Sequence, residues 1–239
     1  DIVRSGPTGI PVRAVQMLWI PVFAVGVING IGHYWGYRNF APNDSSSNVV
    51  PWGILIGGEE LHNNHHAYVT SARLSSKWWE FDIGWMYIRI LEMIHLAKVR
   101  KVAPRIRYDT SKTRCDAGTL QAVITHRYDV LAKFARSLRP TAVEELLSLR
   151  AGLDPVKYLL QRDAAELPEK ESAVLQEALH SSTVLSTIYS MRQDLTDLWS
   201  RSAVPKEQLV KQLEDWCRRA EESGIGALRE FSRTLRCYS

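Results

Sequence analysis

The chain has 239 residues, of which 45% are hydrophobic, and a formal net charge of +4 with a pI near 9.0. This length allows one large domain or two small ones, and the basic balance suits nucleic acid or an anionic membrane face without deciding between them. The three cysteines, Cys115, Cys217 and Cys237, form no CxxC pair, which argues against a disulfide framework or a thiolate zinc site and favours a reducing compartment.

An apolar stretch runs from Val15 to Gly32, VQMLWIPVFAVGVINGIG, in which the only strongly polar side chains are Gln16 and Asn29. As a helix it would rise roughly 27 Å, near the lower bound for crossing a bilayer core. Pro21 and the glycines are tolerated better in membrane helices than in soluble ones. The stretch therefore favours a transmembrane helix, and the alternative is a buried helix of a soluble protein.

The stretch from Trp78 to Ala97 is rich in aromatic and aliphatic side chains, but Asp82, Arg89 and Glu92 interrupt it. This composition argues against a second span and is typical of an amphipathic segment in the headgroup layer. The run KVRKVAPRIR, residues 98–107, carries five basic residues and no acid. Each could contribute ~1 kcal/mol of attraction to an anionic leaflet. A solvated basic linker is the alternative, but after two apolar segments we favour a membrane surface.

From Asp116 onward the chain is charged and has the periodicity of packed helices. Three sets of apolar residues each share a predicted helix face: Ile124, Tyr128, Leu131, Ala135 and Leu138; Leu185, Ile188, Leu195 and Trp199; and Leu209, Leu213, Trp216 and Ala220. Thr141 with Glu144 forms a capping box, which predicts a helix start. Asp154 before Pro155 predicts another. Residues 43–48, NDSSSN, are expected to form a loop.

Three of the seven histidines, His62, His65 and His66, lie within the motif HNNHH. In a helix they occupy positions i, i+3 and i+4, so the three rings project from one face. Converging neutral imidazoles form a strong site for iron, zinc or copper. The HExxH pattern of zinc proteases is absent, because Glu59 and Glu60 precede the first histidine.

Asn29 and His33 are four residues apart at the end of the apolar stretch and form a further candidate pair. A histidine-rich site beside a membrane suggests oxygen activation by iron. The remaining histidines are isolated on predicted helical segments and are interpreted as structural or surface residues: His95, His126 and His180.

Three segments, NGIGHYWGYRNF, NVVPWGILIGGEELHNNHHAY and WWEFDIGWMYIRILE, closely resemble the C-terminal half of membrane fatty acid desaturases of the acyl-CoA (stearoyl-type) class. HNNHH is similar to the third histidine box of that family, and the resemblance covers roughly residues 1–105. It implies a non-haem di-iron centre. In that centre Asn29 would hold an iron-bound water and four histidines would be iron ligands: His33, His62, His65 and His66.

The resemblance implies O2-dependent introduction of a cis double bond, of Δ9 type, into a fatty acyl-CoA or a phospholipid acyl chain. Electrons would come from a cytochrome b5-, ferredoxin- or rubredoxin-type donor, in a bacterial inner membrane with the metal site facing the cytoplasm. Trp78, Trp79 and Trp85 would lie at the substrate-tunnel mouth or the membrane interface, although packing is the favoured role for each. A hydroxylase or ketolase with the same histidine boxes is the alternative.

The first two histidine boxes of the family, HxxxxH and HxxHH, have no counterpart here. Since the chain also starts at Asp1, without a signal-peptide pattern, we expect a truncated, processed or partial product. On this reading it corresponds to the back half of an enzyme and is inactive alone.

Residues 119–239 resemble the C-terminal extension of some proteobacterial desaturases, and the stretch from MRQDLTDLWSRS to the end also resembles a helical region of ISL3-type transposases. No matching set of catalytic aspartates and glutamate accompanies it, and its basic residues alternate with acids. We therefore expect shared helical architecture and no nucleic-acid partner, with a transposase-like nucleic-acid module as the alternative.

The predicted fold is all-α, with transmembrane and interfacial helices that carry a histidine-box metal site, followed by a soluble helical C-terminal domain. The expected boundaries are 1–105 for the desaturase part, 106–118 for a linker and 119–239 for the helical extension.

Overall fold

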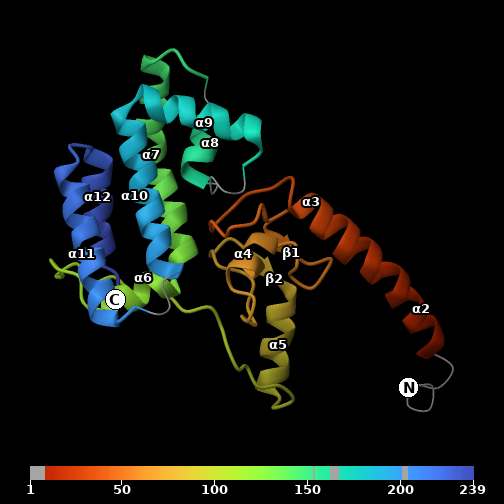
Figure 1. Cartoon of the computed structure of the whole chain (residues 1–239). Helices are drawn as coiled ribbons and strands as arrows, with labels where there is room; N and C mark the ends of the chain where they lie inside the picture. Colours follow the sequence, from red (N-terminus) through yellow and green to blue (C-terminus); the bar gives the residue numbers. More distant parts are fainter. Residues whose placement is uncertain (1–8, 153, 162–166, 201–203) are drawn as a thin grey trace. The chain divides into compact units, whose positions relative to one another are not determined.

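The computed structural model describes residues 9–152, 154–161, 167–200 and 204–239. The chain forms two compact units, unit 1 from Asp1 to Ala103 and unit 2 from Pro104 to Ser239 (Figure 1). Helices dominate both, and the strands among the described residues are two residues long. The helical fold class is therefore confirmed.

The apolar stretch at the start of unit 1 is divided into three helices: α2 (Gly9–Ile20), the π-helix η2 (Pro21–Asn29) and α3 (Gly30–Gly32). The first division falls at Pro21, which has no N–H to donate to the preceding turn. The following segment has the wider hydrogen-bonding of a π-helix. Among the described residues, no helix combines the length and the apolar character needed to cross a membrane. The predicted transmembrane helix is thus not confirmed.

The rest of unit 1 surrounds a pair of parallel two-residue strands, β1 (Trp52–Gly53) and β2 (Phe81–Asp82), with Trp52 opposite Phe81. The histidine motif forms α4 (His62–Ala67), and α5 (Ile83–Met93) follows β2 directly. Helix α5 starts where it does because the Asp82 carboxylate accepts a hydrogen bond of 2.8 Å from the Trp85 N–H.

The interior of unit 1 is largely polar. Its buried apolar side chains, among the described residues, are Ile28, Phe40, Leu61 and Ala67. Three carboxylates are buried with them and accept backbone N–H groups of nearby loops: Glu60, Glu80 and Asp82. Through these hydrogen bonds the three side chains hold the loops in place.

Unit 2 contains seven helices among the described residues: α6 (Ala117–Thr125), α7 (Arg127–Ser148), α8 (Asp154–Gln161), α9 (Glu169–Ser181), α10 (Thr183–Ser200), α11 (Lys206–Glu222) and α12 (Gly226–Arg236). Figure 1 shows α7, α10, α11 and α12 as long neighbours. Between them Phe231 contacts both Phe134 and Trp216, with ring centroids 5.3 and 6.0 Å apart. Unit 2 therefore has the apolar core that unit 1 lacks.

Two details of the helix predictions for unit 2 are wrong. Thr141 and Glu144 do not start a helix, because α7 continues through Pro140. The buried Leu138, Ala142 and Leu146 lie on either side of the proline, and their burial outweighs its cost of about 3 kcal/mol.

The helix face predicted from Ile124 to Leu138 is also interrupted. Thr125 ends α6 and His126 separates it from α7, so the predicted face is divided between two helices. Of the predicted face, Leu131 and Leu138 are buried and Ala135 lies at the edge of the core, while Val130 and Phe134 of α7 are buried beside them.

The first and last segments of unit 2 pair with each other. Tyr108 and Tyr238 form an antiparallel bridge, and the Ser239 N–H donates to the Arg107 carbonyl over 3.1 Å. Cys115 and Cys217 are thiols with sulfur atoms 3.8 Å apart. The segment before α6 thus packs on unit 2.

Candidate metal centre

Helix α4 is held in place by the two asparagines between its histidines. The Asn63 side-chain oxygen accepts the N–H groups of Asn39 and Phe40, each over 2.9 Å. The Asn64 side-chain amide donates to Glu80 over 2.9 Å. With these two positions facing the buried polar network, His62 and His66 lie one turn apart on another side of the helix.

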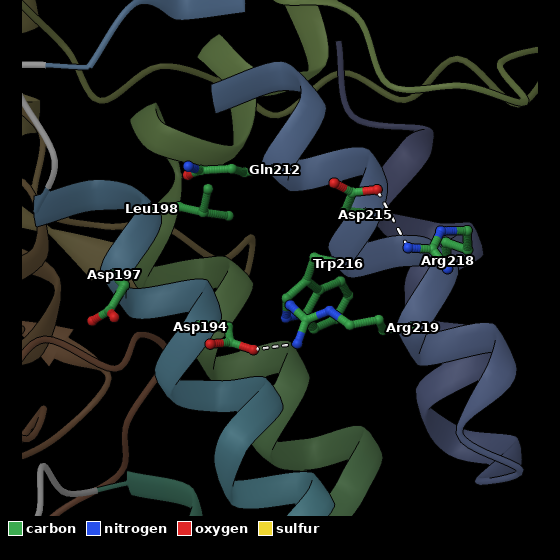
Figure 2. A pocket seen from close by; sticks show the side chains of 8 residues that line it. All are labelled: Asp194, Asp197, Leu198, Gln212, Asp215, Trp216, Arg218 and Arg219. Atoms are coloured by element: carbon green, nitrogen blue, oxygen red, sulfur yellow. Dashed lines mark hydrogen bonds and ion pairs between the residues drawn. The ribbon is translucent and has the colours of Figure 1, made fainter. Parts of the chain in front are cut away.

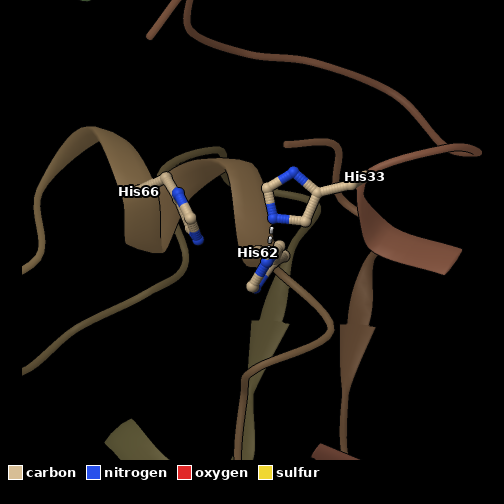
Figure 3. Close-up of side chains that lie close together, drawn as sticks. All are labelled: His33, His62 and His66. Carbon is tan, nitrogen blue, oxygen red and sulfur yellow. Dashed lines mark hydrogen bonds between the residues drawn. The ribbon is translucent and has the colours of Figure 1, made fainter. Parts of the chain in front are cut away.

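The structure brings three histidine rings together, two from α4 and one from the residue that follows α3 (Figure 3). His33, His62 and His66 each offer a ring nitrogen, and these atoms lie within 4.8 Å of one another. The Nε2 atoms of His33 and His62 are 3.2 Å apart. The ring centroids of His62 and His66 are 4.3 Å apart. Residues 29 positions apart in the chain therefore form one candidate ligand group.

Two glycines allow the close approach of the segments around this group. A Cβ at Gly32 would lie 3.2 Å from the His62 ring, which is tighter than ordinary contact. Gly36 has a φ of +133°, and a Cβ there would lie 2.1 Å from the Asn48 carbonyl oxygen. The loop of residues 43–48, predicted as a loop and observed as one, can therefore pass directly beside His33.

The electrostatics of the group favour a neutral ring at His62. Burial, and then the nearby His66, His33 and His65, lower the pKa of His62 to about 4. On the outside, Nδ1 of His66 lies 2.6 Å from the Asp44 carboxylate. Burial would raise the pKa of Asp44, but hydrogen bonds from Ser46 and His66 outweigh it, so the pKa is lowered and the carboxylate is charged.

His65 and Asn29 lie apart from the three-ring group. The His65 ring is 5.9 Å from that of His66 between centroids, and its Nδ1 is buried without a hydrogen-bond partner. Asn29 ends η2 with an exposed side chain. The four predicted histidine ligands therefore divide into three that converge and one that faces elsewhere.

Each of the three isolated histidines has local surroundings of its own. His95 is exposed with a φ of 58°, and His180 Nδ1 bonds to the carbonyl of Gln176 over 2.8 Å. His126 is buried between α6 and α7, and burial lowers its pKa.

Sequence reasoning missed the carboxylate that organises the surroundings of α4. Glu80 is 7% exposed and accepts hydrogen bonds from five groups: the N–H of Ser76 and Lys77, the amides of Asn39 and Asn64, and the Tyr37 hydroxyl. Burial, and then the bond to Glu80, raise the pKa of Tyr37, which stays a neutral donor. Two features of the sequence could have pointed to this network: Glu80 lies between two aromatic residues, and the histidine motif contains two adjacent asparagines.

The chemistry of the donor set fits a metal that prefers imidazole, such as iron, zinc or copper. Nδ1 of His62 and Nδ1 of His65 are buried ring nitrogens without hydrogen-bond partners, and such atoms carry a desolvation cost unless something binds them. The group within reach of one ion contains three histidines, so a complete site for two ions needs further ligands.

The three tryptophans considered for the substrate entrance differ in surroundings. Trp79 contacts Tyr37 with ring centroids 5.2 Å apart, and Arg89 lies 5.7 Å from the Trp85 ring centre. Trp78 is 94% exposed, so the favoured packing role is wrong for it within the described chain. The basic side chains of residues 98–107 are exposed.

Unit 2 contains a hollow of about 370 Å³ between α10 and α11 (Figure 2). Its walls carry several aspartates and arginines, and ion pairs join them across the walls. Arg219 pairs with Asp194 over 2.7 Å, and Arg218 pairs with Asp215 over 3.5 Å. The local charges are thus largely balanced.

Comparison with known proteins gives two likenesses. Residues 120–239, half of the chain, match the family model of the ISL3 transposases. The chain is also 46% identical over 71 residues to Delta-9 acyl-lipid desaturase 1 of Arabidopsis thaliana, which covers 30% of this chain and 23% of that protein.

Two cyanobacterial proteins extend the second likeness. An sn-1 stearoyl-lipid 9-desaturase of Anabaena variabilis is 36% identical over 90 residues, covering 38% of this chain and 33% of that protein. One from Synechocystis sp. is 42% identical over 96 residues, covering 40% and 29%. The chain spans about a quarter to a third of the length of these relatives. No solved structure matches it.

Proposed function

We propose that this chain, which belongs to the ISL3 transposase family through residues 120–239, carries in unit 1 the third histidine box of a fatty acid desaturase. The observation that carries the proposal is the convergence of His33, His62 and His66 on one point. The parent enzyme would introduce a cis double bond, of Δ9 type, into an acyl-CoA or a phospholipid acyl chain with O2.

The metal would be iron, held in part by His33, His62 and His66, with His65 directed to a second ion. When bound, the iron pair would activate O2 for the removal of two hydrogens from an unactivated CH2–CH2 unit, with two electrons from the electron donor and two protons completing the conversion of both oxygen atoms to water. The protein's part is to present neutral ring nitrogens, and the depressed pKa of His62 keeps that ring unprotonated at neutral pH. Asn29 would hold a water on the iron, which requires its side chain to turn toward the rings.

The three converging rings and His65 make four histidines, fewer than a histidine-ligated iron pair requires. His95 is exposed, and His126 and His180 belong to unit 2, where one is buried and the other bonds to its own helix, so we infer that the remaining ligands come from outside these 239 residues. The chain alone would then bind iron weakly and desaturate nothing.

Exposed apolar surface supports a lipid environment for unit 1. Helix α5 has no buried residue, and Tyr87, Ile90 and Met93 on it are each about half or more exposed. Helix α2 similarly exposes Met17 and Leu18. We propose that these faces contact membrane lipid, at the cytoplasmic side of a bacterial inner membrane. The exposed basic run 98–107 would meet lipid headgroups or an acidic electron donor of the cytochrome b5, ferredoxin or rubredoxin type.

Metal analysis and product analysis of the complete parent enzyme, purified in detergent, test this function. We expect about two irons per chain, and a loss of iron in His65→Ala and in His66→Ala, because ligand and near-ligand groups set metal affinity. His33→Ala should abolish desaturation, Asn29→Ala should lower it with more iron retained, and His95→Ala should match wild type. Stoichiometric zinc without iron, or a hydroxylated product instead of an alkene, would contradict the proposal.

For unit 2 we propose a helical module with the architecture of the ISL3 transposases and no strand-transfer activity. Its core supports independent folding, and its arginines at α11 are paired with acids instead of forming a basic stripe. Residues 104–239 expressed alone should be soluble and helical by circular dichroism. Binding of duplex DNA with a steep dependence on salt would instead favour a nucleic-acid function.

A further inference from the structure

Two polar side chains of the loop 43–48 lie against the outer edges of the histidine group. The Asp44 carboxylate is 2.6 Å from Nδ1 of His66, and the Ser45 hydroxyl is 3.5 Å from Nδ1 of His33. The second distance is at the limit of a hydrogen bond, so Asp44 is the stronger partner. The ring nitrogens that remain, the Nε2 atoms, are those available to the centre of the group.

The position of Asp44 is itself fixed by the loop. Its second carboxylate oxygen accepts the Ser46 N–H over 2.9 Å, and its carbonyl accepts the Arg38 guanidinium over 2.9 Å. One bond thus holds the carboxylate and the other holds the backbone of Asp44, which keeps the side chain directed at His66.

We propose that Asp44 is a positioning residue that sets the tautomer of His66. A carboxylate is only an acceptor, so the His66 proton resides on Nδ1 and the lone pair on Nε2. That lone pair is the one a metal ion requires. The inference rests on the proposed metal site, and it adds a residue from the segment 43–48, for which the sequence predicted only a loop.

The test uses the 239-residue chain with histidine labelled by ¹⁵N, and cobalt(II) as the probe metal. In wild type, the long-range couplings between nitrogen and proton should show His66 protonated at Nδ1. Asp44→Asn presents an amide donor to the ring and should move the proton to Nε2. It should also weaken cobalt binding by about 10- to 100-fold, followed by visible absorption.

Two further variants separate positioning from folding. Asp44→Ser keeps a side-chain oxygen for the Ser46 N–H but removes the carboxylate, so it should show the same loss of cobalt affinity with the loop intact. Asp109→Asn is the matched control, because Asp109 accepts the Ser111 N–H in the same i to i+2 pattern with no histidine beside it. This control should bind cobalt as wild type does.

A wild-type His66 protonated at Nε2, or unchanged cobalt affinity in both Asp44 variants, would overturn the proposal. An equal loss in Asp109→Asn would do the same. Failure of the desaturase assignment is distinguishable, because it would appear as absent iron in the complete enzyme while the tautomer of His66 still responded to Asp44.

Discussion

Replacing Glu80 by glutamine should destabilise unit 1 more than any change of one surface charge. Five donors converge on the carboxylate, at distances between 2.5 and 2.9 Å. A glutamine carbonyl oxygen can accept two of them, which leaves three facing an NH2 group or no acceptor. At about 1 kcal/mol for each buried donor without a partner, Glu80→Gln should cost roughly 3 kcal/mol. This corresponds to an unfolded population about 100-fold larger.

Urea denaturation followed by tryptophan fluorescence measures this cost, because six of the eight tryptophans precede residue 86 and report mainly on unit 1. Amide exchange at Ser76 and Lys77 gives a local reading, since both N–H groups lose their acceptor. Glu59→Gln removes one half-buried negative charge from the same unit and should change stability by less than about 0.5 kcal/mol. A loss below 1 kcal/mol in Glu80→Gln, or equal losses in both variants, would refute the view that Glu80 organises the loops.

Two further changes test local features of each unit. Gly32→Ala puts a Cβ 3.2 Å from the His62 ring and should displace that ring. Cobalt affinity should therefore fall several-fold, while the helix content measured by circular dichroism stays constant. An unchanged cobalt affinity would show that the ring moves aside without cost. Asp116→Ala removes the cap at the start of α6, where the carboxylate accepts the Thr119 N–H over 2.6 Å, and should cost about 1 kcal/mol in thermal or urea unfolding, whereas Asp116→Asn should cost less. The bond to Thr119 lowers the pKa of Asp116 to about 2, below its unfolded value. The stability that Asp116 contributes should therefore be complete above about pH 4 and be lost as the pH falls toward 2. An Asp116→Ala variant with the same acid transition as wild type would contradict this.

The histidine group could be predicted because its main signal is local. The i to i+4 spacing of His62 and His66 requires only that α4 is a helix, and the structure forms that helix. The supporting residues could not be predicted in the same way. Glu80, Asn39 and Asp44 reach α4 across 16, 25 and 22 residues, and such pairings depend on loop paths that no periodicity encodes.

The apolar stretch shows what a hydropathy pattern cannot predict. Hydropathy alone treats Val15 to Gly32 as continuous, because it averages over Pro21 and the glycines. Backbone hydrogen bonding is decided residue by residue, and the helix changes type at Pro21. In α7, by contrast, the helix continues through a proline. Buried residues lie on both sides of Pro140, and their packing outweighs the hydrogen bond that the proline cannot make.

The pairing of Tyr108 with Tyr238 joins residues that are far apart in the chain. Contacts of the polar network in unit 1 join residues 16 to 43 positions apart, and these loops close at a small entropic cost. In unit 2, by contrast, Lys133 and Asp129 reach Tyr238 across 105 and 109 residues. During synthesis from the amino end, unit 1 can therefore fold while unit 2 is still incomplete. The segment before α6 can pair with the residues that follow α12 only once those residues have been synthesised.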